Sequence, residues 1–282
     1  MGHTHLWSEV RVGKLDGQVA FISGGARGQG RSHAVRLAEE GADIITFDLC
    51  AQIESVPYPM STPEDFDQTI KGVEATGRRI VACHADARDI AGVRQVFQEG
   101  TKELGPVTIV LANAGIGVGG FEEHDRDWDD VIDVNLTGVW NTIRVAIPCM
   151  IENGKGGSIV LTSSTGGLIG VATNAPGLLA YQASKHGVIG LMRSWANYLA
   201  PHNIRVNSVA PTAVRTPMAV NDLMAKALEA DPGLANAWMN ALPVDMVEAI
   251  DVSNAIAWLV SDDARYVTGT VVPVDAGMVN KR

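Results

Sequence analysis

The chain alternates short apolar runs of strand length with longer segments of helical periodicity, and this alternation most constrains its fold. Strand-like runs are predicted at 19–23, 43–47, 80–84, 107–112, 158–162, 204–210 and 270–274. Strands separated by helices of this length form parallel sheets with right-handed crossovers and helices on both faces. The sequence therefore predicts an α/β fold, a single Rossmann-type doubly wound domain with a parallel sheet of about seven strands.

The sequence contains neither an internal repeat nor an interdomain linker, so one domain is expected at 17–282, after an N-terminal arm at 1–16. Residues 50–63 include three prolines, which favours a stiff, non-helical surface insert. Residues 212–247 are rich in Ala, Leu and Met and are predicted to form one or two short helices. We interpret this segment as a substrate lid, with an ordinary part of the core as the alternative.

Composition limits the classes of partner. A net charge of −10 without a Lys/Arg-rich run argues against nucleic acid or an anionic membrane as a partner. Cys50, Cys83 and Cys149 are far apart, which is typical of free thiols in a reducing cytoplasm. No apolar stretch is long enough to span a bilayer, and the start lacks an export signal, so a cytoplasmic protein is expected. No metal site is predicted, because His3 and His5 lie on a terminus expected to fray.

The first strand runs into a glycine-rich turn, Gly24-Gly25-Ala26-Arg27-Gly28-Gln29-Gly30, followed by a helix. Such a turn directs backbone N–H groups and the positive end of the helix dipole toward a pyrophosphate. Asp48 ends the second strand twenty residues after Gly28. A carboxylate there accepts hydrogen bonds from the ribose hydroxyls and repels a 2′-phosphate, which favours NAD over NADP. Arg27 could instead attract a 2′-phosphate, so NADP remains the less favoured alternative.

The insert at 50–63 follows Asp48 directly, where the adenosine of such a cofactor would lie. It is predicted either to cover the cofactor or to form a passive surface loop. Further along the chain, Asp86, Asn113 and Gly115 fall at the carboxyl ends of predicted strands. These ends meet at the edge of a doubly wound sheet that binds ligands.

Tyr181 and Lys185 stand at positions i and i+4 in what is predicted to be the opening turn of a helix that runs to about Leu199. This spacing puts both side chains on one helix face, where the ammonium group can lower the pKa of the phenol. A phenol so tuned can exchange a proton with a substrate oxygen. His186 is adjacent to Lys185 but points about 100° away from it, so we expect a packing or surface histidine.

With these residues collected, the sequence resembles the short-chain dehydrogenase/reductase family over nearly its whole length. The resemblance rests on Gly24-x-x-x-Gly28-x-Gly30, on Asn113-Ala114-Gly115, and on Asn135, Ser164, Tyr181 and Lys185 as a catalytic tetrad. It implies cofactor contacts from Gly24, Arg27, Gly28, Gln29, Gly30, Asp48, Leu49, Asp86, Ala87, Asn113, Ala114, Gly115, Tyr181, Lys185, Pro211, Thr212, Val214 and Thr216.

The resemblance also implies a reaction. Tyr181 acts as general acid and base while a hydride moves between a secondary alcohol and nicotinamide C4. Lys185 stabilises the phenolate, Ser164 donates to the substrate oxygen, and Asn135 holds a water that links Lys185 to solvent. The interval from Ser164 to Tyr181 is about four residues longer than is usual in the family, which leaves Ser163 as an alternative to Ser164.

Within the family, the insert and the segment 134–142 resemble the actinobacterial carveol-dehydrogenase-like, mycofactocin-associated subgroup. That resemblance implies NAD held tightly under the insert and an external redox partner. The apolar segment 212–247 suggests an apolar alcohol or ketone substrate, such as a cyclic or terpene-like one. Family members pair through helices corresponding to 135–152 and 181–199, so a homotetramer is expected. The competing hypotheses are a cofactor-binding, redox-sensing scaffold with little catalysis and a non-redox relative such as an epimerase.

Overall fold

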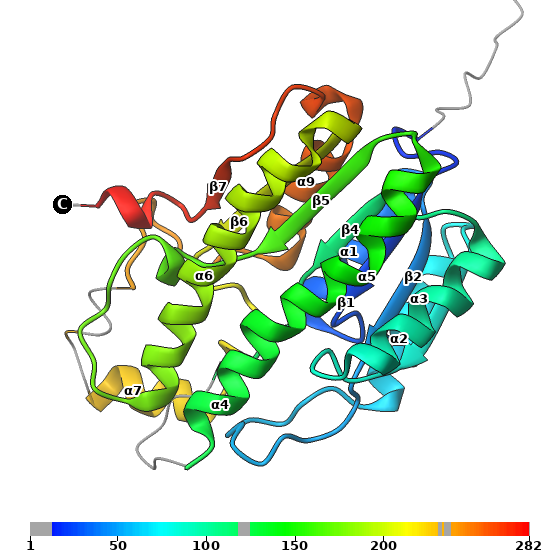
Figure 1. The fold of residues 1–282 in the computed structure, drawn as a ribbon. Helices are drawn as coiled ribbons and strands as arrows, with labels where there is room; N and C mark the ends of the chain where they lie inside the picture. Colours follow the sequence, from blue (N-terminus) through cyan, green and yellow to red (C-terminus); the bar gives the residue numbers. More distant parts are fainter. Residues whose placement is uncertain (1–12, 118–124, 231–232, 234–237, 282) are drawn as a thin grey trace, which may run out of the picture.

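The computed structural model describes residues 13–117, 125–230, 233 and 238–281. Its sheet has seven strands that all run parallel, in the order β3-β2-β1-β4-β5-β6-β7 (Figure 1). The strands are β1 Val19–Ser23, β2 Asp43–Asp48, β3 Ile80–His84, β4 Ile109–Ala112, β5 Gly157–Thr162, β6 Ile204–Pro211 and β7 Val271–Val274. The predicted doubly wound sheet is confirmed. Its strand order reverses between β1 and β4, and this switch point is where such sheets bind ligands.

Helices cover both faces of the sheet (Figure 1). They are α1 Gly28–Glu39, α2 Pro63–Glu74, α3 Ile90–Leu104, α4 Asp127–Ile132, α5 Gly138–Asn153, α6 Pro176–Leu199, α7 Asp222–Ala230 and α9 Ala249–Val260, with a π-helix at Asp133–Thr137 between α4 and α5. Short 3-10 turns lie at Thr165–Gly167, Ala200–His202, Asp262–Ala264 and Met278–Asn280. One face carries α1 and α9, and the other carries α3, α5 and α6.

The two apolar layers explain why the strands are visible in the sequence. Along β1, Val19 and Phe21 belong to the layer under α3, α5 and α6, whereas Ala20 and Ile22 belong to the layer under α1 and α9. Both faces of the strand are therefore buried, and a continuous apolar run results. Phe21 also meets the ring of Phe97 on α3 edge to face, with 5.2 Å between centroids.

Several boundaries differ from the prediction. Helix α6 begins at Pro176, so Tyr181 lies beyond its opening turn; proline suits the first helical position because the N–H there has no intrahelical partner. Helix α2 was missed, although the sequence signals it: Thr62 caps the helix, forms a capping box with Asp65 and precedes Pro63. Strand β4 begins at 109 instead of 107, and β6 continues through Pro211.

Other predicted segments are seen in part. Of the helical region expected at 121–153, residues 121–124 lie outside the described residues and the helix begins at Asp127. The predicted lid contains α7, but 231–232 and 234–237 lie outside the described part, as do 1–12 of the arm. Leu15, near the end of the arm, is fully buried and its N–H donates to Glu40 O. No helix among the described residues is long and apolar enough to cross a bilayer.

Candidate functional site

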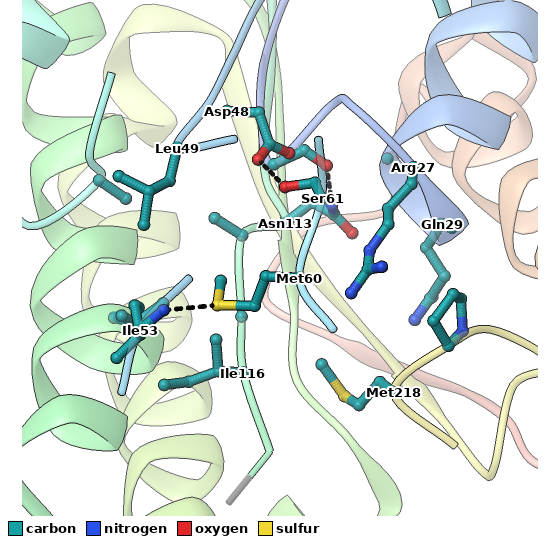
Figure 2. A pocket seen from close by; sticks show the side chains of 18 of the residues that line it. Arg27, Gln29, Asp48, Leu49, Ile53, Met60, Ser61, Asn113, Ile116 and Met218 are labelled. Carbon is teal, nitrogen blue, oxygen red and sulfur yellow. Dashed lines mark hydrogen bonds between the residues drawn. The ribbon is translucent and has the colours of Figure 1, made fainter. Parts of the chain in front are cut away.

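A cleft opens at the carboxyl ends of β1, β2 and β4 and encloses about 920 Å³, counting its open mouth. Of the predicted cofactor residues, it is lined by Gly24, Arg27, Gly28, Gln29, Gly30, Asp48, Leu49, Asp86, Ala87, Asn113, Ala114, Gly115 and Thr216. Figure 2 shows Arg27 and Gln29 on one side of this pocket and Leu49 and Ile53 on the other. One pocket thus gathers residues from widely separated segments.

The glycine-rich turn leaves room at the N-terminus of α1. Gly24 and Gly28 have φ of 73° and 55°, a left-handed conformation that glycine adopts at little cost. A Cβ on Gly30 would collide with the carbonyl oxygen of Gly24. The Oε1 atom of Gln29 is buried without a hydrogen-bond partner in the described structure. A helix N-terminus with close backbone access suits a phosphate group, and an unpartnered acceptor suits a ligand that also carries donors.

Asp48 is fixed in place by three hydrogen bonds. Its Oδ2 accepts from the N–H of Ala26 at 3.0 Å, and its Oδ1 accepts from the Ser61 hydroxyl at 2.6 Å and from the N–H of Cys50 at 3.2 Å. Figure 2 shows the bond between Asp48 and Ser61. These contacts join the carboxylate to both the glycine-rich turn and the insert.

The insert is an ordered wall of the pocket, to which it contributes Ile53, Tyr58, Met60 and Ser61. Hydrogen bonds from one side chain, Gln52, fix its backbone: Nε2 donates to the carbonyl oxygens of Ile53, Val56 and Tyr58, and Oε1 accepts from the N–H of Met60. The geometry therefore favours an insert that covers the cofactor over a passive surface loop.

Three further hydrogen bonds tie the insert to the rest of the domain. Arg27 donates to Pro59 O at 2.6 Å, and the Ser55 hydroxyl donates to Asp130 Oδ2 at 2.8 Å. The N–H of Gly117 donates to the Tyr58 hydroxyl at 3.1 Å. Since Asp130 lies on α4 and Gly117 follows β4, the insert spans the pocket from the glycine-rich turn to the far side.

Two strand-end segments are also held rigidly. The Arg88 guanidinium forks onto both carboxylate oxygens of Asp86, with its closest contact at 2.7 Å, and Asn141 Nδ2 donates to Ala87 O. Asn113 donates to Ser23 O through its side-chain amide. This last bond ties the end of β4 to β1.

The four residues of the predicted tetrad lie together beside the pocket. A Cβ on Gly115 would lie 3.3 Å from Asn135 Oδ1 and 3.5 Å from Lys185 Nζ. A Cβ on Gly166 would lie 3.5 Å from the Tyr181 ring and 3.6 Å from Ser164 Oγ. Lys185 Nζ is 5.6 Å from the centroid of the Tyr181 ring. Because Gly115 also lines the pocket, the tetrad adjoins the predicted cofactor residues.

The two candidate serines have different surroundings. Ser163 is buried, and its hydroxyl donates to the carbonyl oxygen of Lys185 at 2.9 Å. The Ser164 hydroxyl accepts from the N–H of Gly166 at 3.1 Å and faces the Tyr181 ring. Only Ser164 keeps its hydroxyl proton available near Tyr181, so the geometry favours Ser164.

Asn135 sits in the π-helix and is completely buried. Its Oδ1 accepts from the N–H of Ile116 and its Nδ2 donates to Ile116 O, both at 2.8 Å. The side chain therefore satisfies the backbone N–H and carbonyl groups of Ile116, in the segment that follows β4. π-Helical turns of this kind are frequent at functional sites.

Burial dominates the ionisation of the Tyr181–Lys185 pair. It raises the pKa of Tyr181, and the Ser164 hydroxyl opposes that shift. Burial lowers the pKa of Lys185 to about 8, and its Nζ donates to Thr162 O at 2.9 Å. The expected decrease in the pKa of Tyr181 caused by Lys185 is not found in this structure. The phenol is neutral near pH 7.

The predicted nicotinamide-end segment lies only partly on the pocket. Thr216 lines it, whereas Pro211, Thr212 and Val214 do not; the Thr212 hydroxyl is buried and donates to Asn240 Oδ1 at 2.9 Å. His186 is exposed, as expected. Within the described residues, no cluster of His, Cys, Asp or Glu could hold a metal ion.

Sequence reasoning missed several lining residues, chiefly the apolar Ile116, Val134, Pro217 and Met218 and the individual side chains of the insert. The proline-rich composition of 50–63 signalled a special segment, but no spacing rule identifies which of its side chains face the pocket. Figure 2 shows that Met60 and Met218 approach the pocket from different segments.

The comparisons with known proteins decide the family. A family model described as "Enoyl-(Acyl carrier protein) reductase" matches residues 24–279. A putative short-chain type dehydrogenase/reductase of Mycolicibacterium smegmatis is 50% identical over 282 residues, covering 96% of this chain and 100% of the relative. The chain belongs to the short-chain dehydrogenase/reductase family. Membership of this family makes it an oxidoreductase.

Two other members of this dehydrogenase family are similar over nearly their whole length. The (-)-trans-carveol dehydrogenase of Rhodococcus erythropolis is 48% identical, covering 96% of this chain and 100% of the relative. A crystal structure of carveol dehydrogenase from Mycobacterium avium in complex with NAD is 48% identical, with a TM-score of 0.89 over 95% of this chain and 100% of that one.

Proposed function

We propose that this dehydrogenase interconverts an apolar secondary alcohol and its ketone, with NAD as hydride carrier. The observation that carries the proposal is the cluster of Asn135, Ser164, Tyr181 and Lys185 beside the pocket that holds the glycine-rich turn and Asp48. A proton-transferring phenol adjacent to a dinucleotide pocket is what alcohol oxidation requires.

The cofactor is NAD, and the pocket fits it. The N-terminus of α1 and the close backbone access at Gly24 and Gly28 accommodate a diphosphate. Asp48 faces the same pocket with a fixed carboxylate, which accepts from ribose hydroxyls and repels a 2′-phosphate. The Mycobacterium avium carveol dehydrogenase, of similar fold, was crystallised with NAD. Arg27 is turned to the insert by its bond to Pro59 O, which weakens the case for NADP.

Bound NAD supplies a hydride acceptor at nicotinamide C4, and the chain supplies the proton chemistry. Tyr181 first loses its proton toward solvent through Lys185 and a water held by Asn135, and the phenolate then takes the proton of the alcohol oxygen. In the reverse direction the neutral phenol donates its proton to the oxygen of the ketone as the hydride arrives. The Ser164 hydroxyl donates to the substrate oxygen and stabilises the negative charge that develops on it. Lys185, as an ammonium group 5.6 Å from the centroid of the Tyr181 ring, favours the phenolate that forms during turnover, although burial keeps the resting phenol neutral. Asn135 fixes the segment after β4 and holds a water that connects Lys185 to solvent.

The substrate is apolar, such as a cyclic or terpene-like alcohol. Ile116, Val134, Pro217 and Met218 give the pocket apolar walls near Gly115. Helix α7 follows Met218 and belongs to the segment that we propose as the lid. The relative from Rhodococcus erythropolis is a (-)-trans-carveol dehydrogenase, which supports a substrate of this class.

We extend the proposal to the handling of the cofactor. The insert walls the pocket and is bonded at four places, to Arg27, Asp48, Gly117 and Asp130, so NAD is retained between turnovers. A retained cofactor must be reoxidised in place, which calls for an external redox partner of the mycofactocin-associated type. The proposed assembly is a cytoplasmic homotetramer that pairs through α5 and α6, where Trp140 and Tyr198 are exposed.

The experiment is the identification of nucleotide released by acid from protein purified without added cofactor. Stoichiometric NAD or NADH, measured by absorbance and mass spectrum, is the expected result. NADP in its place would contradict the assigned role of Asp48. A site that purifies without nucleotide would contradict retention, and the protein would then be assayed with free NAD as an exchanging dehydrogenase.

A further inference from the structure

Tyr58 lies in the insert, and the proposed reaction gives its hydroxyl group no role. Its side chain is only 7% exposed, although it belongs to a proline-rich surface segment. It packs in an apolar cluster with Ile116 and Val134, lines the pocket, and presents its hydroxyl to the backbone of Gly117.

The hydroxyl of Tyr58 is half satisfied. It accepts a hydrogen bond from the N–H of Gly117 at 3.1 Å, and it donates to no group among the described residues. A phenol oxygen both accepts and donates, and a buried O–H is expected to find an acceptor. Burial raises the pKa of Tyr58 to about 12, so the proton is present throughout the working range of pH.

The neighbours of Tyr58 indicate which part of the pocket it faces. The next residue, Pro59, accepts from the Arg27 guanidinium at 2.6 Å, and Arg27 belongs to the glycine-rich turn. On its other side Tyr58 is bonded to Gly117, two residues beyond Gly115. The segment that carries Tyr58 is therefore held between the Arg27 guanidinium and the residues after β4, along the path from the N-terminus of α1, where a diphosphate binds, toward the tetrad.

We propose that the Tyr58 hydroxyl donates its proton to an oxygen of the cofactor diphosphate, so that the insert binds the cofactor directly as well as covering it. This inference rests on the proposed function. A diphosphate is the group in that stretch with the most hydrogen-bond acceptors and no donors, and it matches a buried O–H whose own acceptor capacity is already used by Gly117. The diphosphate would then be bound by the N-terminus of α1 on one side and by the insert on the other.

The position of Tyr58 is preorganised. Gln52 Nε2 donates to the carbonyl oxygen of Tyr58 and also to that of Val56, which fixes the backbone on which the ring is mounted. A donor that is already aimed loses little side-chain entropy when the ligand binds.

Tyr58→Phe tests the proposal because it keeps the ring and removes only the hydroxyl. The first readout is the release of nucleotide from the purified full-length protein, followed by filtration and mass spectrometry. Loss of a hydrogen bond to a charged group should speed release about tenfold or more. Tyr266→Phe is the matched control, since it removes the hydroxyl of a tyrosine that is 90% exposed and does not line the pocket, and it should leave the release rate unchanged.

Tyr58→Phe also removes the acceptor for the N–H of Gly117, so a second measurement separates the two effects. The affinities of ADP-ribose, which contains a diphosphate, and adenosine, which does not, are compared on protein refolded without nucleotide. The proposal predicts that Tyr58→Phe weakens ADP-ribose about tenfold and leaves adenosine unchanged. Equal weakening of both ligands, or of neither, would overturn it.

This comparison does not depend on retention. If the wild-type protein purifies without nucleotide, the retention part of the proposed function fails, while the two affinities still decide the role of Tyr58. If wild-type protein retains NAD and Tyr58→Phe releases it at the wild-type rate with unchanged affinity for ADP-ribose, the role of Tyr58 fails and retention stands.

Discussion

The Ser61 hydroxyl donates a 2.6 Å hydrogen bond to Oδ1 of Asp48 and joins the insert to the carboxylate at the end of β2. The same carboxylate accepts from Ala26 in the glycine-rich turn through Oδ2. Asp48 is therefore bonded both to the glycine-rich turn, where the diphosphate is expected to bind, and to the insert, which forms one wall of the pocket. Asp48 is therefore expected to influence both the choice between NAD and NADP and the position of the insert.

Asp48→Asn should reduce the preference for NAD over NADP. The change removes the negative charge that repels a 2′-phosphate while keeping the shape of the side chain. We expect NADH affinity to fall about tenfold and NADPH affinity to rise, measured by nucleotide fluorescence on refolded, nucleotide-free protein. Asp67→Asn on the exposed side of α2 is the control and should change neither. If the ratio of NADH affinity to NADPH affinity were unchanged in Asp48→Asn, Asp48 would not determine the cofactor preference.

The two adjacent serines provide a matched pair. Ser164→Ala should lower kcat by about 10²–10³, the loss typical of removing one donor to a developing oxyanion. Ser163→Ala loses the hydrogen bond to Lys185 O, so it should cost about 1 kcal/mol of stability and leave most of the activity. Steady-state kinetics and urea unfolding of both variants make the comparison. The opposite pattern would transfer the role to Ser163.

Gly30→Ala should disrupt the turn, because its Cβ would collide with the carbonyl oxygen of Gly24. A clash with backbone should cost about 2 kcal/mol or more and reduce the nucleotide content of the purified protein. Gly190→Ala is the matched helical control: within one subunit a Cβ there meets nothing within 4 Å, so it should leave the glycine-rich turn and the nucleotide content unchanged. Thermal unfolding and released nucleotide are measured for both. Equal behaviour of the two variants would contradict the close approach at Gly30.

His33 should make stability decrease with acid. Burial between α1 and α9 lowers its pKa to about 3 from 6.5, and its Nδ1 lies 2.8 Å from the Ser253 hydroxyl. Below pH 6.5 the unfolded chain binds a proton that the folded chain does not, so stability falls as pH falls from 6.5 toward 3. The loss from this group amounts to about 2 kcal/mol by pH 5.

The variant His33→Gln cannot take up that proton, so its stability should depend less on pH between 6.5 and 5. Urea unfolding of both proteins at matched NAD concentration measures the difference. Parallel pH profiles for His33→Gln and wild type would show that the histidine is not kept neutral by burial.

Much of the fold could be predicted because its signals are local. Strands such as β1 bury both faces and are therefore continuous apolar runs, and the spacing of Tyr181 and Lys185 fixes their shared helix face. The start of α2 was equally local, in Thr62 and Asp65, and was overlooked. Contacts between distant segments carry no such signal.

Two contacts illustrate what could not be predicted from the sequence. Asn135 pairs with the backbone of Ile116 across the site, and Tyr58 bonds to Gly117 from a different segment of the chain. The pKa of Tyr181 is a similar case, since helix spacing predicts the effect of Lys185 whereas burial, which depends on the whole fold, determines the direction of the shift.

The central claim is that Tyr181 transfers the proton while NAD carries the hydride. The direct measurement is a single-turnover experiment in which NAD-loaded protein is mixed with a panel of cyclic and terpenoid secondary alcohols and the absorbance of reduced nicotinamide is recorded. Wild-type protein should show a burst with at least one alcohol, and Tyr181→Phe should retain NAD and lose the burst by at least about 10²-fold. A burst of wild-type rate in Tyr181→Phe would contradict the mechanism, and no burst with any alcohol in wild type would favour a cofactor-binding scaffold.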